Sequence, residues 1–231
     1  MNQRNSPARV VFLFDVDNTL LDNERVAADL QRHLADEIGP EGAQEYWRIF
    51  EQLRAELGYA DYLGALQRYR TEHPRAPHLL IVSHFLINYP FAERLFPHAL
   101  KVIEHVQQWG PAVILSDGDV VFQPLKISRA GLADAVSGRV LIYVHKEQEL
   151  DDVEQRYPAQ HYVLVDDKLR ILTAVKKFLG SRVTTVFVRQ GRYATDSKTV
   201  ASYPAADIGI ERIGDLLRYD LPNLLKAKTA S

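Results

Sequence analysis

Short runs of consecutive apolar residues are separated along much of this chain by longer segments in which apolar residues recur every three or four positions. The first run, residues 10–14, is rich in Val and Phe and too short for a buried helix. Such a run is typical of a central parallel strand, which is covered on both faces. Comparable runs predict strands at residues 112–115, 139–144, 162–165 and 183–188, and a short edge strand at 207–210.

The segments between these runs predict helices, because their apolar residues share one helical face. Residues 97–110, for example, are expected to form a helix with Leu100, Ile103 and Val106 turned inward and Gly110-Pro111 as its stop. Strands that alternate with helices form a parallel sheet with right-handed crossovers. The predicted fold class is therefore α/β, a doubly wound parallel sheet.

Residues 22–95 interrupt this alternation, because they show helical periodicity and no strand-like run. Asp22 can cap a first helix, which Gly39-Pro40 ends. Its apolar stripe at i+4 spacing is Val26, Leu30, Leu34 and Ile38, and further helices are expected at residues 47–57, 59–69 and 79–87. We therefore predict an all-helical insert at 22–95 and a core formed by residues 1–21 and 96–231, with 226–231 as a frayed tail.

Composition excludes several classes of protein. Of the 231 residues, 46% are hydrophobic, which supports a sizeable core. The net charge of −2 argues against binding to nucleic acid, and the absence of Cys excludes disulfides, thiol nucleophiles and cysteine-bound metal. Residues 1–9 do not resemble a signal peptide, and no apolar run is long enough to span a bilayer. A cytoplasmic protein with no membrane partner is therefore expected.

Polar residues follow four of the predicted strands and point to a reactive centre. They are Asp15 and Asp17, then Ser116, then Lys146, and finally the pair Asp166 and Asp167. The carboxyl ends of parallel strands lie at one edge of a sheet, where ligands bind, so we expect these side chains to converge. Neighbouring carboxylates are costly there unless they bind a cation or take part in chemistry. Carboxylates, a hydroxyl and an ammonium group together meet the needs of phosphoryl transfer, which depends on positioning and charge neutralisation.

The order of these motifs resembles that of the haloacid dehalogenase-like (HAD) hydrolase superfamily. The motifs are Asp-Val-Asp-Asn-Thr-Leu at 15–20, Leu-Ser-Asp-Gly-Asp at 115–119, Lys146, and Val-Asp-Asp-Lys at 165–168. The resemblance extends over roughly residues 9–190. It implies a Rossmannoid core in which residues 22–95 form a helical cap, a required Mg²⁺, and usually the hydrolysis of phosphate esters.

The resemblance also implies roles for the first motif. Asp15 would be the nucleophile that forms an aspartyl-phosphate, and Asp17 would be the general acid and then the general base. Thr19 would orient the first loop and belong to the phosphate-binding residues. Asn18 stands where Gly is common in the family, and Asn tolerates a left-handed backbone well.

The remaining motifs imply the binding groups. Ser116, Asp117 and Lys146 would complete the phosphate-binding set, and Lys146 would also moderate repulsion between the nucleophile and the phosphate dianion. Unlike the lysine of many capped relatives, Lys146 is not followed by Pro, so its assignment depends on where the fold places it. Mg²⁺ would be bound by Asp15, by the backbone carbonyl of Asp17, by Asp167 directly and by Asp166 through water.

Four functions remain open at this point. The first is Mg²⁺-dependent hydrolysis of small phosphate monoesters through an aspartyl-phosphate. A phosphosugar mutase would use the same core, whereas a dehalogenase would need neither Asp17 nor the metal, and a non-catalytic binding protein would be expected to lose core acids that this chain keeps. The cap is expected to select the substrate. Candidate selecting residues are Arg25, Arg48, Tyr59, Tyr62 and His84 in the insert, and Gln123 and Lys126 in the core.

Overall fold

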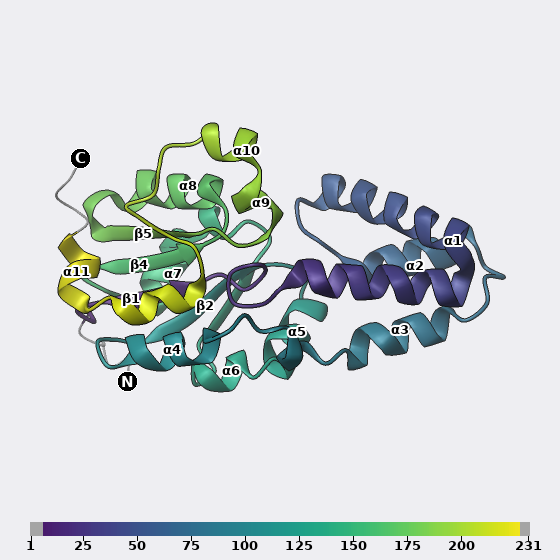
Figure 1. Ribbon diagram of the computed structural model, residues 1–231, viewed down its shortest axis with the longest axis horizontal. Coiled ribbons are helices and arrows are strands. Elements are labelled where there is room, and N and C mark those ends of the chain that lie inside the picture. The colour runs from purple at the N-terminus through teal and green to yellow at the C-terminus, as the bar shows by residue number, and fades with distance from the viewer. Residues whose placement is uncertain (1–6, 227–231) are drawn as a thin grey trace.

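In the computed structural model, which describes residues 7–226, parallel strands form one sheet in the order β3-β2-β1-β4-β5-β6 (Figure 1). The strands are β1 (Val11–Phe14), β2 (Ala112–Asp117), β3 (Val140–Tyr143), β4 (Tyr162–Asp166), β5 (Val183–Val188) and β6 (Ile208–Ile210). Each strand lies where a short apolar run predicts it. The predicted α/β class and doubly wound parallel sheet are therefore confirmed.

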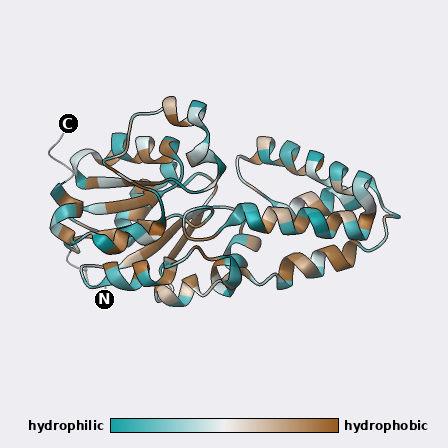
Figure 2. Cartoon of the chain, viewed as in Figure 1, coloured by the Kyte–Doolittle hydropathy of each residue, from teal (hydrophilic) through white to brown (hydrophobic). Residues whose placement is uncertain are grey.

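Helices cover both faces of the sheet, and Figure 2 shows hydrophobic residues gathered along the strands between them. Alternate residues of β1 point to opposite faces, so Phe12 and Phe14 belong to one core cluster and Val11 and Leu13 to the other. The first cluster includes residues of α4 (Ala99–Gln107), α5 (Phe122–Arg129), α6 (Leu132–Ala135) and α11 (Leu221–Lys226). The second includes residues of α7 (Leu150–Arg156), α8 (Leu169–Leu179), α9 (Gly191–Thr195) and α10 (Ser197–Ala201).

The register of the sheet aligns the ends of its central strands. Phe14, the last residue of β1, pairs with Ile114 of β2 and with Val165 of β4. The backbone N–H of Asp15 donates to the carbonyl of Val165 at 3.0 Å. The residues that leave these strands therefore emerge side by side, as the sequence predicts for a parallel sheet.

The helical insert, residues 22–95, contains α1 (Asn23–Leu57), α2 (Tyr62–Glu72) and α3 (Leu79–Asn88), which lie together and extend away from the sheet (Figure 1). Asp22 caps α1 by accepting a hydrogen bond from the backbone N–H of Arg25 at 2.9 Å. The insert joins the core through two neighbouring segments, because Leu21 and Leu95 form an antiparallel bridge.

The predicted break at Gly39-Pro40 is confirmed, whereas two other details of the predicted helices are wrong. Gly39 leaves the helical conformation (φ 80°, ψ 164°), and the chain turns back there, so α1 consists of two helices, the second of which can start at Pro40 (Figure 1). The next helix begins at Tyr62 rather than Tyr59. Leu100 is 42% exposed, because α4 turns Ala99, Val102, Ile103 and Val106 inward instead.

Four 3-10 helices complete the described elements: η1 (Phe91–Arg94), η2 (Lys146–Gln148), η3 (Gly180–Arg182) and η4 (Ile213–Arg218). No helix within residues 7–226 is long and apolar enough to cross a membrane. Most of the polar segment 1–9, and nearly all of the tail predicted at 226–231, lie outside the described residues. The domain boundaries and the cytoplasmic location stay predictions.

Candidate active site

The loop after β1 is a tight turn that presents Asp15 and Asp17 at the sheet edge. The carbonyl of Val16 accepts hydrogen bonds from three backbone N–H groups, those of residues 19–21. Asn18 adopts the left-handed backbone (φ 62°) that the sequence predicts it to tolerate. Gly191 lies directly against this turn, since a Cβ added there would come 2.6 Å from the Cβ of Asn18. The turn is therefore fixed by its own hydrogen bonds and by close packing.

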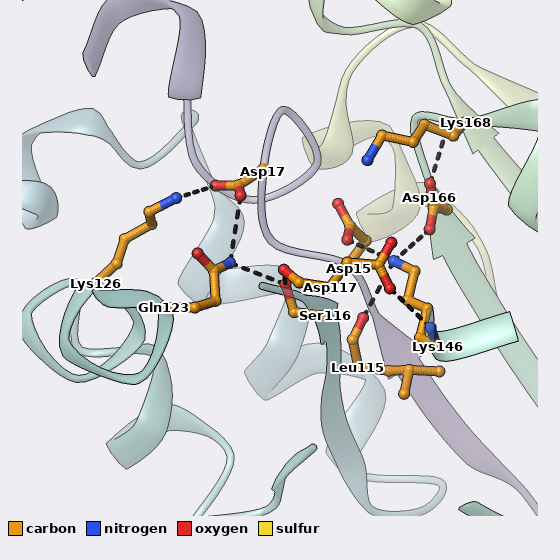
Figure 3. A network of polar contacts seen from close by, with 10 residues as sticks. All are labelled: Asp15, Asp17, Leu115, Ser116, Asp117, Gln123, Lys126, Lys146, Asp166 and Lys168. Atoms are coloured by element: carbon orange, nitrogen blue, oxygen red, sulfur yellow. Dashed lines mark hydrogen bonds and ion pairs between the residues drawn. The ribbon is translucent and has the colours of Figure 1, made fainter. Parts of the chain in front are cut away.

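Lys146 reaches the centre of the site from η2 (Figure 3). Its Nζ is 2.5 Å from an oxygen of Asp15, 2.7 Å from an oxygen of Asp166, and donates to the carbonyl of Leu115 at 3.2 Å. Burial alone would lower the pKa of Lys146, but the charges of Asp15 and Asp166 outweigh burial and raise that pKa above its ordinary value. The lysine therefore stays charged without solvent, even though no Pro follows it.

Asp15, Asp166 and Asp167 form a buried cluster of carboxylates that could hold a metal ion. Each offers an oxygen, and these oxygens lie within 4.8 Å of one another. Within the part of the chain that the structure describes, Asp15 Oδ2 and both side-chain oxygens of Asp167 have no hydrogen-bond partner. Burial raises the pKa of Asp167 well above its ordinary value, and that of Asp166 to about 6. A divalent cation with oxygen ligands fits this donor set and would offset the cost of its burial.

Asp17 turns away from this cluster and contacts α5 (Figure 3). Its oxygens accept hydrogen bonds from Lys126 Nζ at 2.7 Å and from Gln123 Nε2 at 3.3 Å. Lys126, which is only 1% exposed, also donates to Asn23 at 3.1 Å, and Asn23 donates to the Tyr62 hydroxyl at 3.3 Å. A chain of polar contacts therefore connects Asp17 with the helical insert.

The other predicted phosphate-binding residues have different surroundings. Ser116 Oγ accepts a hydrogen bond from Gln123 at 2.9 Å, which places it between the cluster and Asp17. Thr19 is buried, and its hydroxyl has no partner among the described residues. The carboxylate of Asp117 accepts from the backbone N–H of Lys146 at 2.8 Å and so positions that lysine. Contact of any of these groups with phosphate stays a prediction.

A cavity of about 440 Å³ opens between the insert and the core beside Asp17. The insert approaches the core closely there, since a Cβ at Gly58 would come 2.4 Å from the ring of His145. Of the predicted selecting residues, Tyr59, Tyr62 and Gln123 line the cavity, whereas Arg25, Arg48, His84 and Lys126 do not. Its cationic lining residues are Arg54, Lys168, Arg170 and Arg192.

Sequence reasoning gave no role to Arg54 or to Lys168. Arg54 belongs to a charged, partly solvated face of α1, where its neighbours along the chain carry no distinguishing pattern. Lys168 directly follows the predicted metal-binding pair, and that adjacency was a signal that could have identified it.

Comparison with known proteins agrees with this geometry. The chain matches the family model of the haloacid dehalogenase-like hydrolases over residues 10–188, and it belongs to this family. It is 63% identical to a structure from Burkholderia xenovorans LB400, described only as a haloacid dehalogenase-like hydrolase, with a TM-score of 0.89 over 93% of this chain and 100% of that one. No curated protein sequence matches it.

Two more distant structures show the same fold. One is the L-2-haloacid dehalogenase of Xanthobacter autotrophicus with chloropropionic acid covalently bound, which is 19% identical, with a TM-score of 0.58 over 91% of this chain and 97% of that one. The other is a HAD-hydrolase of Bacillus subtilis bound to magnesium, which is 17% identical, with a TM-score of 0.58 over 92% of this chain and 98% of that one. The family match and the 63% identity to the Burkholderia structure make the protein a HAD-like hydrolase.

Proposed function

We propose that this hydrolase cleaves small phosphate monoesters, with Mg²⁺, through an aspartyl-phosphate on Asp15. The observation that carries the proposal is the buried cluster of Asp15, Asp166 and Asp167, which leaves carboxylate oxygens without partners beside a charged Lys146. Burying these charged groups costs free energy, and a bound cation and an anionic substrate would offset that cost. Bound Mg²⁺ would supply positive charge to neutralise phosphate oxygens.

The residues of the chain divide the reaction between them. An oxygen of Asp15 attacks phosphorus, and the bond to the ester oxygen breaks as that oxygen keeps the electron pair and takes a proton from Asp17. Water then attacks the phosphorus of the aspartyl-phosphate, gives its proton to Asp17 and releases phosphate. Lys146, already 2.5 Å from Asp15, lowers the repulsion between that carboxylate and the incoming dianion.

The contact between Asp17 and Lys126 matters for the order of these steps. The ion pair, at 2.7 Å, stabilises Asp17 as a carboxylate. This is the form that receives a proton from water in the second half-reaction. In the first half-reaction Asp17 must carry a proton, so it must loosen this contact. Because the same lysine is hydrogen-bonded to Asn23 at the start of α1, a movement of the insert would disturb the pair directly.

The insert is proposed to act as a lid that excludes water and selects the substrate. It meets the core at Gly58 and His145, and the cavity beneath it, about 440 Å³, has room for a small metabolite but not for a folded protein. The magnesium-bound relative from Bacillus subtilis, whose structure is described as revealing interdomain movement, supports a metal and a moving lid in this fold.

Dehalogenation is the main alternative, since a similar fold carries it in Xanthobacter autotrophicus. In that reaction an aspartate attacks carbon, and neither a metal nor the second carboxylate of the first motif is needed. Dehalogenation would give no role to Asp17 or to the unpartnered oxygens of Asp167. Phosphate-ester hydrolysis gives a role to both, so it explains more of the residues of the site.

A paired assay tests the proposal. Purified protein is offered a panel of small phosphate monoesters and, separately, 2-chloropropionate, each with Mg²⁺ or with excess chelator. We expect phosphate release that requires Mg²⁺ and no halide release. Calorimetric titration should in addition show Mg²⁺ binding that is lost in Asp167→Asn and kept in Asp151→Asn, an exposed aspartate of α7. Phosphate release that is undiminished in chelator, or halide release alone, would contradict the proposal.

A further inference from the structure

Three cationic side chains surround the ring of Tyr193 in α9. The guanidinium carbons of Arg192 and Arg54 lie 5.1 Å and 5.7 Å from the ring centroid, and Lys168 Nζ lies 5.6 Å from it. All four residues, which we call the Tyr193 cluster, line the cavity that Asp17 also lines. The cluster is therefore part of the space in which a substrate would lie.

The Tyr193 cluster is assembled from three separate parts of the chain. Arg54 comes from the last turn of α1 in the insert, Lys168 directly follows the proposed metal-binding pair, and Arg192 comes from α9, which follows β5. Lys168 also connects the cluster with the reaction centre, because its backbone N–H donates a hydrogen bond to a carboxylate oxygen of Asp166 at 2.8 Å (Figure 3). An anion held by the cluster would thus be close to a phosphate attacked by Asp15.

Among the described residues, two of the three cations of the cluster have no close ion pair with an acid. Within residues 7–226, neither Lys168 Nζ nor the guanidinium group of Arg192 has a carboxylate oxygen within 4.0 Å. Arg54 has one, 3.4 Å away on Glu51, whose side chain is 56% exposed. By contrast, Arg170 in the same cavity forms an ion pair with Glu147.

Each of the other acids of the cavity accepts a hydrogen bond, and one of them, Asp17, is paired with a charged group. Asp17 pairs with Lys126, Asp117 accepts from the backbone of Lys146, and Glu24 accepts from the backbone N–H of Arg192. Like charges gathered round one ring repel one another, and the cation–π contacts with the ring compensate this repulsion only in part. An anionic ligand would supply the partner that Lys168 and Arg192 lack among the described residues.

We infer that the Tyr193 cluster binds a second anionic group of the substrate, so that the substrate is a phosphate monoester that also carries a carboxylate or a second phosphate. This inference rests on the proposed phosphatase function. The planar fork of arginine suits both anions, since each can accept two parallel hydrogen bonds. Arg54 brings the insert into the recognition, so the second anion would also hold the insert against the core.

Matched pairs of esters test the inference. 3-Phosphoglycerate differs from glycerol 3-phosphate mainly in a carboxylate, and fructose 1,6-bisphosphate differs from fructose 6-phosphate in a second phosphate. We expect kcat/KM to be about tenfold to hundredfold higher for the doubly anionic member of at least one pair, as hydrogen bonds to charged groups provide. The preferred pair identifies which anion the cluster takes.

Variants assign the preference to the cluster. In Arg54→Gln and in Arg192→Gln the ratio of kcat/KM within the preferred pair should fall towards one, mainly through KM. Controls are Arg48→Gln, on the same helix but paired with Glu45, and Arg189→Gln, which lies near Glu211 at the end of β5; both should keep the wild-type ratio. All four side chains are on the surface or half-buried, so the variants should fold, which thermal unfolding checks.

Two failures can be told apart. If the wild type hydrolyses the esters with equal kcat/KM within both pairs, or if the ratio survives in Arg54→Gln and Arg192→Gln, the second-anion inference is overturned while the phosphatase stands. If the wild type hydrolyses none of the esters with Mg²⁺, the proposed function fails and the inference fails with it.

Discussion

The core and the helical insert contribute charged groups to the site in contrasting ways. In the core, Lys146, Asp166 and Asp167 are fully buried and lie directly after strands or in the turns that follow them. In the insert, Arg54 and Tyr59 are partly exposed and reach the cavity only because α1 ends at Gly58 against the core. The core groups are held by the backbone register of a parallel sheet, whereas the insert groups depend on how helices pack. We therefore propose that the core carries the chemistry and that the insert contributes to selection through Arg54 and Tyr59.

The first way to test this contrast is to remove the nucleophile. In Asp15→Asn the amide cannot form an aspartyl-phosphate, so turnover should fall by at least about a thousandfold for every substrate. Steady-state phosphate release measures the effect. Asp151→Asn, an exposed aspartate of the same core, serves as the control and should keep wild-type activity. A variant at position 15 that retains a tenth of the activity would break the assignment.

A second prediction concerns stability and depends on the buried acids. The pKa of Asp166 is about 6 in the folded protein against an ordinary value of 3.8, so the folded state holds the proton more tightly between these values. With chelator present, the free energy of unfolding should therefore fall with rising pH through this window, relative to Asp166→Asn, by on the order of 1 to 3 kcal/mol.

Urea unfolding from pH 4 to pH 7 measures this difference. Asp167, whose pKa burial also raises, acts in the same direction and is kept in both proteins. Above about pH 6 the difference should stay constant. Mg²⁺ should reduce it, because the cation stabilises the ionised cluster. A wild type that gains stability over the variant as the pH rises would show that this acid is not held in the protonated form by burial.

The smallest expected effect tests whether the insert takes part in substrate selection. Tyr59 lines the cavity from the insert, half-exposed, so Tyr59→Phe removes a hydroxyl from the selecting surface and leaves the core intact. We expect the ratio of kcat/KM between two metabolite esters to differ by about threefold to tenfold between the variant and the wild type. The kcat/KM for p-nitrophenyl phosphate should change less. Equal changes for all esters would place Tyr59 in the chemistry instead. Tyr157→Phe, in the core away from the cavity lining, is the matched control.

Much of the core could be predicted from the sequence, because short stretches of sequence determine its strands and the polar residues that follow them. Each apolar run is short and ends in a polar residue, so the strands, and the convergence of Asp15, Ser116, Lys146 and Asp166 at one sheet edge, follow from parallel pairing. The error at Leu100 arose because the start of α4 sets which face is buried, and one residue of shift turns a side chain outward.

The cavity's cations were harder to predict, since their proximity is created by packing between distant segments. Arg54 and Arg192 meet on one ring although the insert and the end of β5 lie far apart in the chain. Lys126 was recognised only as a residue able to face the substrate. Its ion pair with Asp17 depends on the orientation of α5 against the first loop, which no local pattern encodes.

The central claim is that Asp15 becomes phosphorylated during the reaction. Asp17 gives a proton to the leaving group in the first step and takes one from water in the second. The most direct measurement uses Asp17→Asn with Mg²⁺ and a phosphate ester that has a good leaving group, quenched in acid and analysed by peptide mass spectrometry. The variant should accumulate phosphate on the peptide that contains Asp15, since the leaving group needs little help but water lacks its base. No label should form in Asp15→Asn. Acid-stable phosphate on Ser116, or a label that also forms in excess chelator, would contradict the account.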